Sequence, residues 1–364
     1  MNIDSKVGNN HINNAISDCT DNKLFYLGCL LGKILHKDSN YISNEYKKCL
    51  QNIKKNDIYL SDIEKNNMKT DDKILVLLTC NWLPNEDICN LWNKMSTNND
   101  FTWKNVKIVS KEPCHYYCII NSPFDKNLAY IPQKTILFRM EPHMKSNEHF
   151  WGSYWSDPPN KDDFLFYGDH SNKFNNNEWH LSKTYNQLCN ENIEKSSSLS
   201  CILSTILSDK YNDPGHKKRI DFMKFVESKN TLIVHVFGGN YFKWNNYKGS
   251  LPLHNKDDSL LPYKYSFNVE NFSIKNYYTE KIIDGILAET LVFYSGCPNI
   301  KDFFDERAFV YLELIDFEKD YQTIKNAIDN DLWKERLPYI KQAKNKILNN
   351  LQFFPRIHEI LNVK

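Results

Sequence analysis

Short apolar runs that alternate with helix-like segments constrain the fold of this chain more than any other feature of its sequence. The first run is Ile74–Leu78, which has five consecutive apolar residues between Lys73 and Thr79. Such a run is typical of a strand buried on both faces of a parallel sheet, because it shows no polar side. A helix pattern at 86–95 follows it. The alternation continues along the chain and predicts an α/β fold.

We expect further strands and helices in both halves of the chain. In the first half, strands are predicted at 116–120, 134–138 and 165–167, with 179–181 as a further candidate. In the second half, strands are predicted at 199–207, 231–237, 264–269, 291–294 and 309–314. Helices are predicted at 216–228, 277–288 and 321–330, and the stretch 240–260 is predicted to be a long loop.

Composition divides the chain into four parts. Residues 1–70 are polar and rich in Asn and Lys, with two amphipathic patterns, and predict a helical extension. Two Rossmann-type domains facing a cleft are predicted, one at 71–195 and one at 196–337. The polar stretch 190–198 marks the boundary between them. Residues 338–364 predict a helical tail. Ligands of such sheets bind at the carboxyl ends of the strands, so we expect functional residues in the turns that follow them.

Charge and hydropathy exclude two classes of protein. The 364 residues carry 46 basic and 45 acidic side chains, and a net charge of +1 argues against a dedicated nucleic-acid-binding protein. No apolar run approaches the roughly 20 residues that cross a bilayer, so we expect no membrane span. Only five of the basic residues are arginines. Each arginine is therefore a candidate for a site that needs a planar, bidentate donor.

The densest group of polar residues follows the strand predicted at 264–269. Glu270 and Asn271 end that strand, and Glu280 and Lys281 fall in the first turn of the next helix. A lysine there opposes the helix dipole, and a bound anion would offset that cost. Glu280 would then accept hydrogen bonds from ribose hydroxyls. The alternative is a surface helix capped by Thr279.

The segment 263–317 resembles the donor-binding signature of family 10 glycosyltransferases, the α1,3/α1,4-fucosyltransferases. The resemblance lies in Tyr263-Lys264-Tyr265, Val269-Glu270-Asn271-Phe272, Tyr277-Tyr278-Thr279-Glu280-Lys281, the strand 291–296 and Asp316-Phe317. It covers about 55 residues, and many spaced positions agree in order. This sequence departs from the family's Phe-Glu-Asn-Ser, because its serine is displaced to Ser273. The identity of the donor sugar is therefore left open.

The resemblance implies a GT-B-like, inverting enzyme that uses GDP-fucose, with an acceptor domain at 71–195 and a donor domain at 196–337. It places Tyr277, Glu280 and Lys281 on donor-contacting positions, with Glu280 on the ribose and Lys281 on the phosphates. Arg219 resembles the arginine that grips the pyrophosphate, and a surface helix residue is the alternative. Asn271 would shape the turn or touch the sugar.

The resemblance also places the general base in the first domain, just past the strand at 134–138. Glu141 falls on the family's proposed catalytic glutamate. An inverting transfer needs one carboxylate to take the proton of the acceptor hydroxyl. Two alternatives stay open. Glu141 could pair structurally with Arg139, or His143 could act as the base, since an imidazole transfers protons near neutral pH.

No obligatory metal site is expected. Asp329-Asn330-Asp331 has the spacing of a metal-binding DxD motif but falls at the end of a predicted helix. Cys114 and Cys118 lack the second pair of ligands that a structural zinc site needs. A divalent cation is expected at most to stimulate the reaction by bridging phosphates.

The expected partners are a nucleotide sugar and a glycan acceptor. Trp151, Tyr154, Trp155 and Trp179 are candidates for stacking on acceptor sugars, with burial in the core as the alternative. The extension at 1–70 is a candidate for self-association. Because no membrane span is evident, we expect the protein to act in the cytoplasm, or in a host cytoplasm if the gene is viral. A transferase with another nucleotide sugar and a non-catalytic carbohydrate-binding scaffold are the alternatives.

Overall fold

Two six-stranded sheets form the framework of the computed structural model. The structure describes residues 73–141, 161–173, 175, 177–205, 213–239 and 242–362. The extension predicted at 1–70 lies outside the described residues, as do His143, Trp151, Tyr154 and Trp155. Two α/β sheets confirm the predicted fold class.

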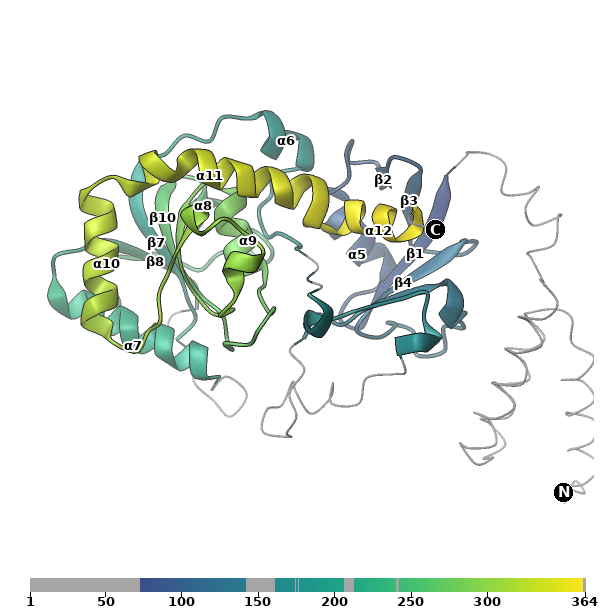
Figure 1. The fold of residues 1–364 in the computed structure, drawn as a ribbon, viewed down its shortest axis with the longest axis horizontal. Coiled ribbons are helices and arrows are strands. Elements are labelled where there is room, and N and C mark those ends of the chain that lie inside the picture. The colour runs from purple at the N-terminus through teal and green to yellow at the C-terminus, as the bar shows by residue number, and fades with distance from the viewer. Residues whose placement is uncertain are drawn as a thin grey trace, which may run out of the picture. The chain divides into compact units, whose positions relative to one another are not determined.

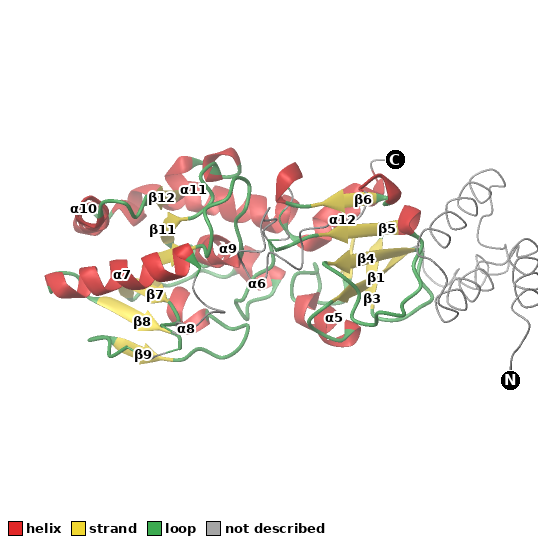
Figure 2. Ribbon diagram, turned by 90° about the horizontal axis from the view of Figure 1, so that it is seen from below, coloured by secondary structure: helices red, strands yellow, loops and turns green. Residues whose placement is uncertain are grey.

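The first sheet has the strand order β2-β3-β1-β4-β5-β6. Figure 2 shows its strands from β3 to β6 side by side. Every pairing is parallel except that of β2 with β3. The central strand β1 is buried from Val76 to Cys80, as its apolar run predicts. The strands are β1 (Ile74–Cys80), β2 (Thr102–Trp103), β3 (Val106–Val109), β4 (Tyr116–Ile120), β5 (Thr135–Phe138) and β6 (Phe166–Gly168).

The first half differs from the sequence prediction in two places. The hairpin β2–β3 was not predicted, because β2 has two residues and β3 alternates between buried and half-buried positions. The strand predicted at 179–181 is absent. Trp179 is instead buried in the core, and its indole Nε1–H donates to the carbonyl of Lys183 at 3.0 Å. The α-helices that the structure describes in this half are α5 (Asn85–Asn93) and α6 (Tyr185–Asn190).

The second sheet has the order β12-β11-β10-β7-β8-β9, and all of its pairings are parallel. Its strands are β7 (Ser197–Ile202), β8 (Val234–Phe237), β9 (Tyr247–Gly249), β10 (Tyr263–Val269), β11 (Leu291–Ser295) and β12 (Phe309–Tyr311). The helices that follow are α7 (Pro214–Lys229), α8 (Asp257–Leu260), α9 (Glu280–Leu287) and α10 (Phe317–Asp329).

Two features of the second half correct the prediction. The stretch 240–260 is not only a loop, since it holds the edge strand β9 and the short helix α8. The helix predicted from Tyr277 begins at Glu280 instead. Thr279 is extended and caps that helix, because its side-chain oxygen accepts a hydrogen bond from the backbone N–H of Lys281.

Helices cover both faces of the second sheet. On one face, Phe222 of α7 packs against Phe267 of β10 and Phe317 of α10, with ring centroids 5.2 and 5.3 Å apart. On the other face, α9 lies close to β11. A Cβ at Gly285 of α9 would lie 2.4 Å from Cγ2 of Val292, so this close packing requires glycine. The sheet is therefore doubly wound.

The end of the chain returns to the first sheet. Helix α11 (Leu332–Lys346) continues through a π-helical turn (Ile347–Leu351) into α12 (Phe353–Asn362), drawn in yellow in Figure 1. Phe353 packs on Trp92 of α5 at 4.8 Å between ring centroids, and the Gln352 side chain donates to the carbonyl of Met95 at 3.1 Å. The helical tail predicted by the sequence therefore packs on the first half of the chain.

Candidate functional site

The carboxyl ends of β7 and β10 form a topological switch point. From β7 the chain passes through α7 to β8 on one side, and from β10 it passes through α9 to β11 on the other. The two helices leave toward opposite faces, which opens a crevice between their first turns. Ligands of open α/β sheets bind at this place.

A pocket of about 250 Å³ lies at this switch point. Backbone and apolar groups at the ends of three strands line it, among them Leu203, Gly238 and Val269. Its charged walls come from α7, α9 and the turn before α8. These charged residues are Arg219, Lys256, Glu280, Lys281 and Asp284.

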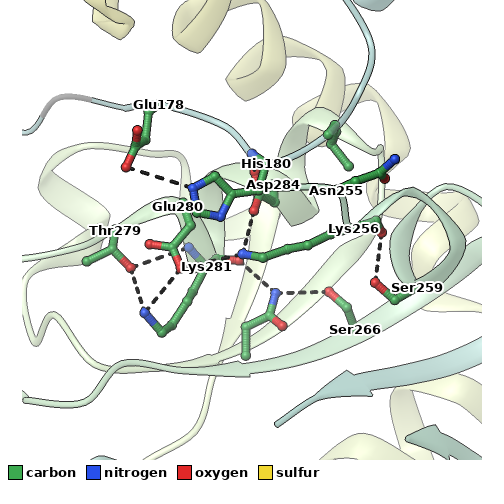
Figure 3. Close-up of polar contacts among 12 residues, drawn as sticks. Glu178, His180, Asn255, Lys256, Ser259, Ser266, Thr279, Glu280, Lys281 and Asp284 are labelled. Atoms are coloured by element: carbon green, nitrogen blue, oxygen red, sulfur yellow. Dashed lines mark hydrogen bonds and ion pairs between the residues drawn. The ribbon is translucent and has the colours of Figure 1, made fainter. Parts of the chain in front are cut away.

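Glu270 ties the end of β10 to the start of α9. Its buried carboxylate accepts hydrogen bonds from the backbone N–H of Thr279 at 2.8 Å and from the Thr279 hydroxyl at 2.7 Å. The Nζ of Lys281 lies 3.5 Å from the same carboxylate. These contacts fix the first turn of α9 against the strand, and its two charged residues line the pocket. Figure 3 shows Glu280 and Lys281 beside Thr279.

Lys281 and Glu280 are both held in their charged forms. Burial alone would lower the pKa of Lys281, but the charges of Glu280 and Glu270 raise it. Burial alone would raise the pKa of Glu280, but Lys281 and Lys256 hold it well below its usual value. The pocket therefore presents an ammonium and a carboxylate side by side at neutral pH.

Arg219 is positioned by a close contact between α7 and the turn after β10. The N–H of Gly215 donates to the carbonyl of Asn271 at 2.9 Å, and a Cβ at Gly215 would lie 1.9 Å from the carbonyl oxygen of Glu270. One turn later, the Nη1 group of Arg219 donates to the carbonyl of Val269 at 3.1 Å and to Oδ1 of Asn271 at 2.9 Å. Only glycine at position 215 permits this approach.

One nitrogen of the Arg219 guanidinium has no partner within the part of the chain that the structure describes. Its Nη2 contacts Nδ1 of His216 at 2.5 Å, whereas its Nε is buried with no hydrogen-bond partner. A buried donor without a partner is costly, so this side chain is held at an energetic cost beside the pocket that it lines.

Asn271 and Tyr277 do not belong to the walls of the pocket as the structure describes them. Asn271 orients Arg219 through its side-chain oxygen. Tyr277 is 8 % exposed and its ring lies edge-on to His170, with centroids 6.1 Å apart. Burial raises the pKa of Tyr277, and the negative charges of Glu270 and Glu141 raise it further.

Glu141 follows β5, at the carboxyl edge of the first sheet. The preceding residues are fixed by backbone hydrogen bonds, from Arg139 to the carbonyl of Gly168 at 2.8 Å and from Met140 to Oδ1 of Asn121 at 2.9 Å. The charge of Glu141 acts on Tyr277, which precedes α9 by three residues. Glu141 therefore stands within electrostatic range of the segment that leads into the pocket.

Three residues of the site were not predicted from the sequence: Lys256, Asp284 and Glu270. Glu270 belongs to the quoted motif, and its place at the end of a strand was a usable signal. Asp284 lies four residues after Glu280, so both share one face of α9. Lys256 gave no signal, because Lys256-Asp257-Asp258 has the composition of a solvated turn.

Beside the pocket, Glu178 and His180 have shifted pKa values. Burial, aided by the charge of Glu280, raises the pKa of Glu178 to about 7. Burial lowers the pKa of His180 to about 4, against the opposing charge of Asp284. Among the residues that the structure describes, no group of three or more His, Cys, Asp or Glu side chains is placed to hold a metal ion. Asp329 ends α10 and Asp331 precedes α11, as the sequence predicts.

No helix within the described ranges is long and apolar enough to span a membrane. No protein-family model matches the chain. Among curated proteins, Alpha-(1,3)-fucosyltransferase FucT of Helicobacter pylori is 33% identical over 106 residues. That match covers 27% of this chain and 22% of the relative, so it spans about a fifth of the relative's length. It confirms the resemblance to fucosyltransferases that the motifs predict.

Among solved structures, the chain is similar to a crystal structure of an alpha1,3-fucosyltransferase with GDP, at a TM-score of 0.43 and 16% identity over 79% of this chain and 93% of that one. It is also similar to T4 phage BGT in complex with UDP and Mn²⁺, at a TM-score of 0.41 and 10% identity over 80% of this chain and 99% of that one.

Proposed function

We propose that this chain is an inverting glycosyltransferase that transfers L-fucose from GDP-fucose to a hydroxyl of a glycan, in an α1,3 linkage. One observation carries the proposal. At the switch point of the second sheet, a pocket combines the first turn of α9 with Arg219, Lys281 and Glu280. This set of groups matches two of the three chemical parts of a nucleoside diphosphate, the diphosphate and the ribose.

The diphosphate is the ligand of Arg219 and Lys281. The guanidinium of Arg219 and the Nζ of Lys281 bind its oxygens, and the first turn of α9 adds partial positive charge. As the bond between the sugar and the diphosphate breaks, negative charge grows on the leaving group. The same cations then stabilise that charge. A divalent cation that bridges the phosphates would stimulate the reaction without being required.

Glu280 takes the ribose. Its ionised carboxylate accepts hydrogen bonds from the sugar hydroxyls, which fixes the nucleoside end of the donor. Asn271 serves the site through Arg219, whose Nη1 it holds. Tyr277 supports the site indirectly, because it is buried in the segment that leads into α9.

Glu141 is the general base of the proposed reaction. Its carboxylate takes the proton of the acceptor hydroxyl while that oxygen forms a bond to the anomeric carbon. GDP leaves from the opposite face, so the configuration inverts. The position of Glu141 at the carboxyl edge of the first sheet, within range of Tyr277, supports this role. The acceptor would then bind on the first half of the chain.

The test is a transfer assay with GDP-fucose and a panel of glycan acceptors, with the product linkage determined by NMR. The expected product has the anomeric configuration opposite to that of the donor, at a fucose linked to O3. Transfer of another sugar from its nucleotide donor would support the transferase activity and contradict fucose as the sugar. Nucleotide binding without transfer to any acceptor, or no nucleotide binding, would favour a carbohydrate-binding scaffold.

A further inference from the structure

Lys256 occupies a position in the pocket that the proposed roles of the other residues leave unexplained. It lies in the turn before α8, far in sequence from α9, yet its Nζ reaches two carboxylates of that helix. It lies 2.7 Å from Oδ2 of Asp284 and 3.4 Å from Oε1 of Glu280. Its side chain is 16 % exposed, so this is a largely buried cation between two carboxylates (Figure 3).

We propose that Lys256 is a positioning residue that holds the Glu280 carboxylate for the ribose hydroxyls of a bound nucleoside diphosphate. The inference rests on the proposed function, and it adds a specificity-determining residue to that site.

The backbone of Lys256 is held as firmly as its side chain. Its N–H donates to the carbonyl of His180 at 2.8 Å, and the N–H of His180 donates to Oδ1 of Asp284 at 2.7 Å. Asp284 is fully buried, and each of its oxygens has a partner. The backbone of Lys256 is therefore fixed relative to Glu280. Its side chain cannot move away without leaving the charge of Asp284 buried and unpaired.

Lys256 also determines how Glu280 shares its charge with Lys281. The Oε1 atom of Glu280 lies 3.3 Å from Nζ of Lys281 and 3.4 Å from Nζ of Lys256. With both lysines present, the carboxylate lies between two cations and does not neutralise Lys281 alone. Without Lys256, Glu280 would pair with Lys281 only and turn toward the phosphate-binding side of the pocket. The charges of Asp284 and Glu280 raise the pKa of Lys256 against the effect of burial, so Lys256 stays charged in this role.

The experiment compares the affinities of the full chain for GDP and for 2′,3′-dideoxy-GDP, which lacks the ribose hydroxyls. The wild type is expected to prefer GDP by about tenfold or more, as for hydrogen bonds to a charged group. Lys256→Met should weaken GDP binding by about tenfold and leave the dideoxy nucleotide within about threefold, so the preference disappears. Glu280→Gln should give the same pattern, and the combination should lose little more. Lys256→Arg should restore part of the preference.

Two further variants separate positioning from folding. Lys256→Met with Asp284→Asn removes both charges, leaves no buried unpaired ion and keeps an acceptor for His180. This pair should show the same loss of preference. Lys229→Met is the matched control, because Lys229 also pairs with a carboxylate, that of Glu318, at 2.6 Å, but at the carboxyl end of α7. It should bind both nucleotides as the wild type does.

Equal weakening of GDP and the dideoxy nucleotide in Lys256→Met and in the double variant would overturn the inference, since it would make Lys256 a phosphate ligand or a purely structural residue. The inference would also be overturned if Lys256→Met and the double variant still preferred GDP over the dideoxy nucleotide as the wild type does. Failure of the wild type to bind GDP would instead overturn the proposed function on which the inference rests.

Discussion

Glu270, at the end of β10, accepts two hydrogen bonds from Thr279, the residue that caps α9. The loop between these residues is therefore closed at its base by one carboxylate, which is 1 % exposed. The same carboxylate lies 3.5 Å from Nζ of Lys281. A structural contact and the charge state of the pocket thus depend on a single side chain.

Glu270→Ala should lower the free energy of unfolding by about 2–4 kcal/mol, because two half-buried donors of Thr279 lose their acceptor and Lys281 loses a counter-ion. Urea denaturation measures this loss. Glu306→Ala, at an exposed glutamate, is the control and should stay within about 0.5 kcal/mol. A Glu270→Ala protein as stable as the control would show that the closed loop contributes nothing to stability.

Arg219→Lys should fail to replace arginine. Lysine keeps the charge, but all its donors lie on one nitrogen, whereas the planar guanidinium binds Val269 and Asn271 through Nη1 and carries further N–H groups on Nη2 and Nε. We expect GDP affinity to fall about tenfold or more in Arg219→Lys and further in Arg219→Ala. Calorimetric titration checks this. Wild-type affinity in Arg219→Lys would mean that only charge matters at this position.

Glu141→Gln should lower the rate of transfer by about 100- to 10,000-fold, because the amide cannot take the proton of the acceptor hydroxyl. GDP affinity should not change, since Glu141 follows the first sheet and the pocket lies in the second. Steady-state kinetics and titration with GDP provide the two readouts. His143→Ala tests the alternative base, and a larger loss in that variant would exchange the two roles.

The Glu178–His180 pair should give two opposing dependences of stability on pH. The pKa of Glu178 is raised from 4.5 to about 7, so its contribution to stability is complete below pH 4.5 and is lost as pH rises to about 7. The pKa of His180 is lowered from 6.5 to about 4, so its contribution is complete above pH 6.5 and is lost as pH falls to about 4.

Single variants should separate the two contributions. Relative to the wild type, the stability of Glu178→Gln should rise between pH 4.5 and 7, and that of His180→Asn should fall between pH 4 and 6.5. Each change should amount to at most about 3 kcal/mol. Urea denaturation across this range is the measurement, with the double variant as control. Parallel profiles in both single variants would contradict the prediction.

The sequence predicted most of the sheets and part of the site for one physical reason. Strands such as β4 and β11 are buried on both faces, so their apolar runs are visible without knowledge of their neighbours. Glu280 and Lys281 stand at a helix start, where the charge of the lysine opposes the macrodipole, which is also a local signal. The structure brings both residues to the pocket.

Residues whose role depends on distant partners could not be predicted in this way. Lys256 resembles a solvated turn residue until Asp284 is placed beside it. The edge strand β9 has three residues and only half-buried or exposed positions, so no periodic pattern marks it. The helix start at Glu280 depended on Glu270, which holds the preceding residue in an extended conformation. The positions of 1–70 and His143 fall outside the described residues.

The measurement that tests the proposal most directly is isothermal titration of the full chain with GDP, UDP and dTDP, with and without Mg²⁺. We expect selective binding of GDP that does not require Mg²⁺ and is lost in Lys281→Ala and Arg219→Ala. A preference for UDP or dTDP would contradict fucose as the sugar. Absence of nucleotide binding by the folded protein would contradict the donor pocket itself.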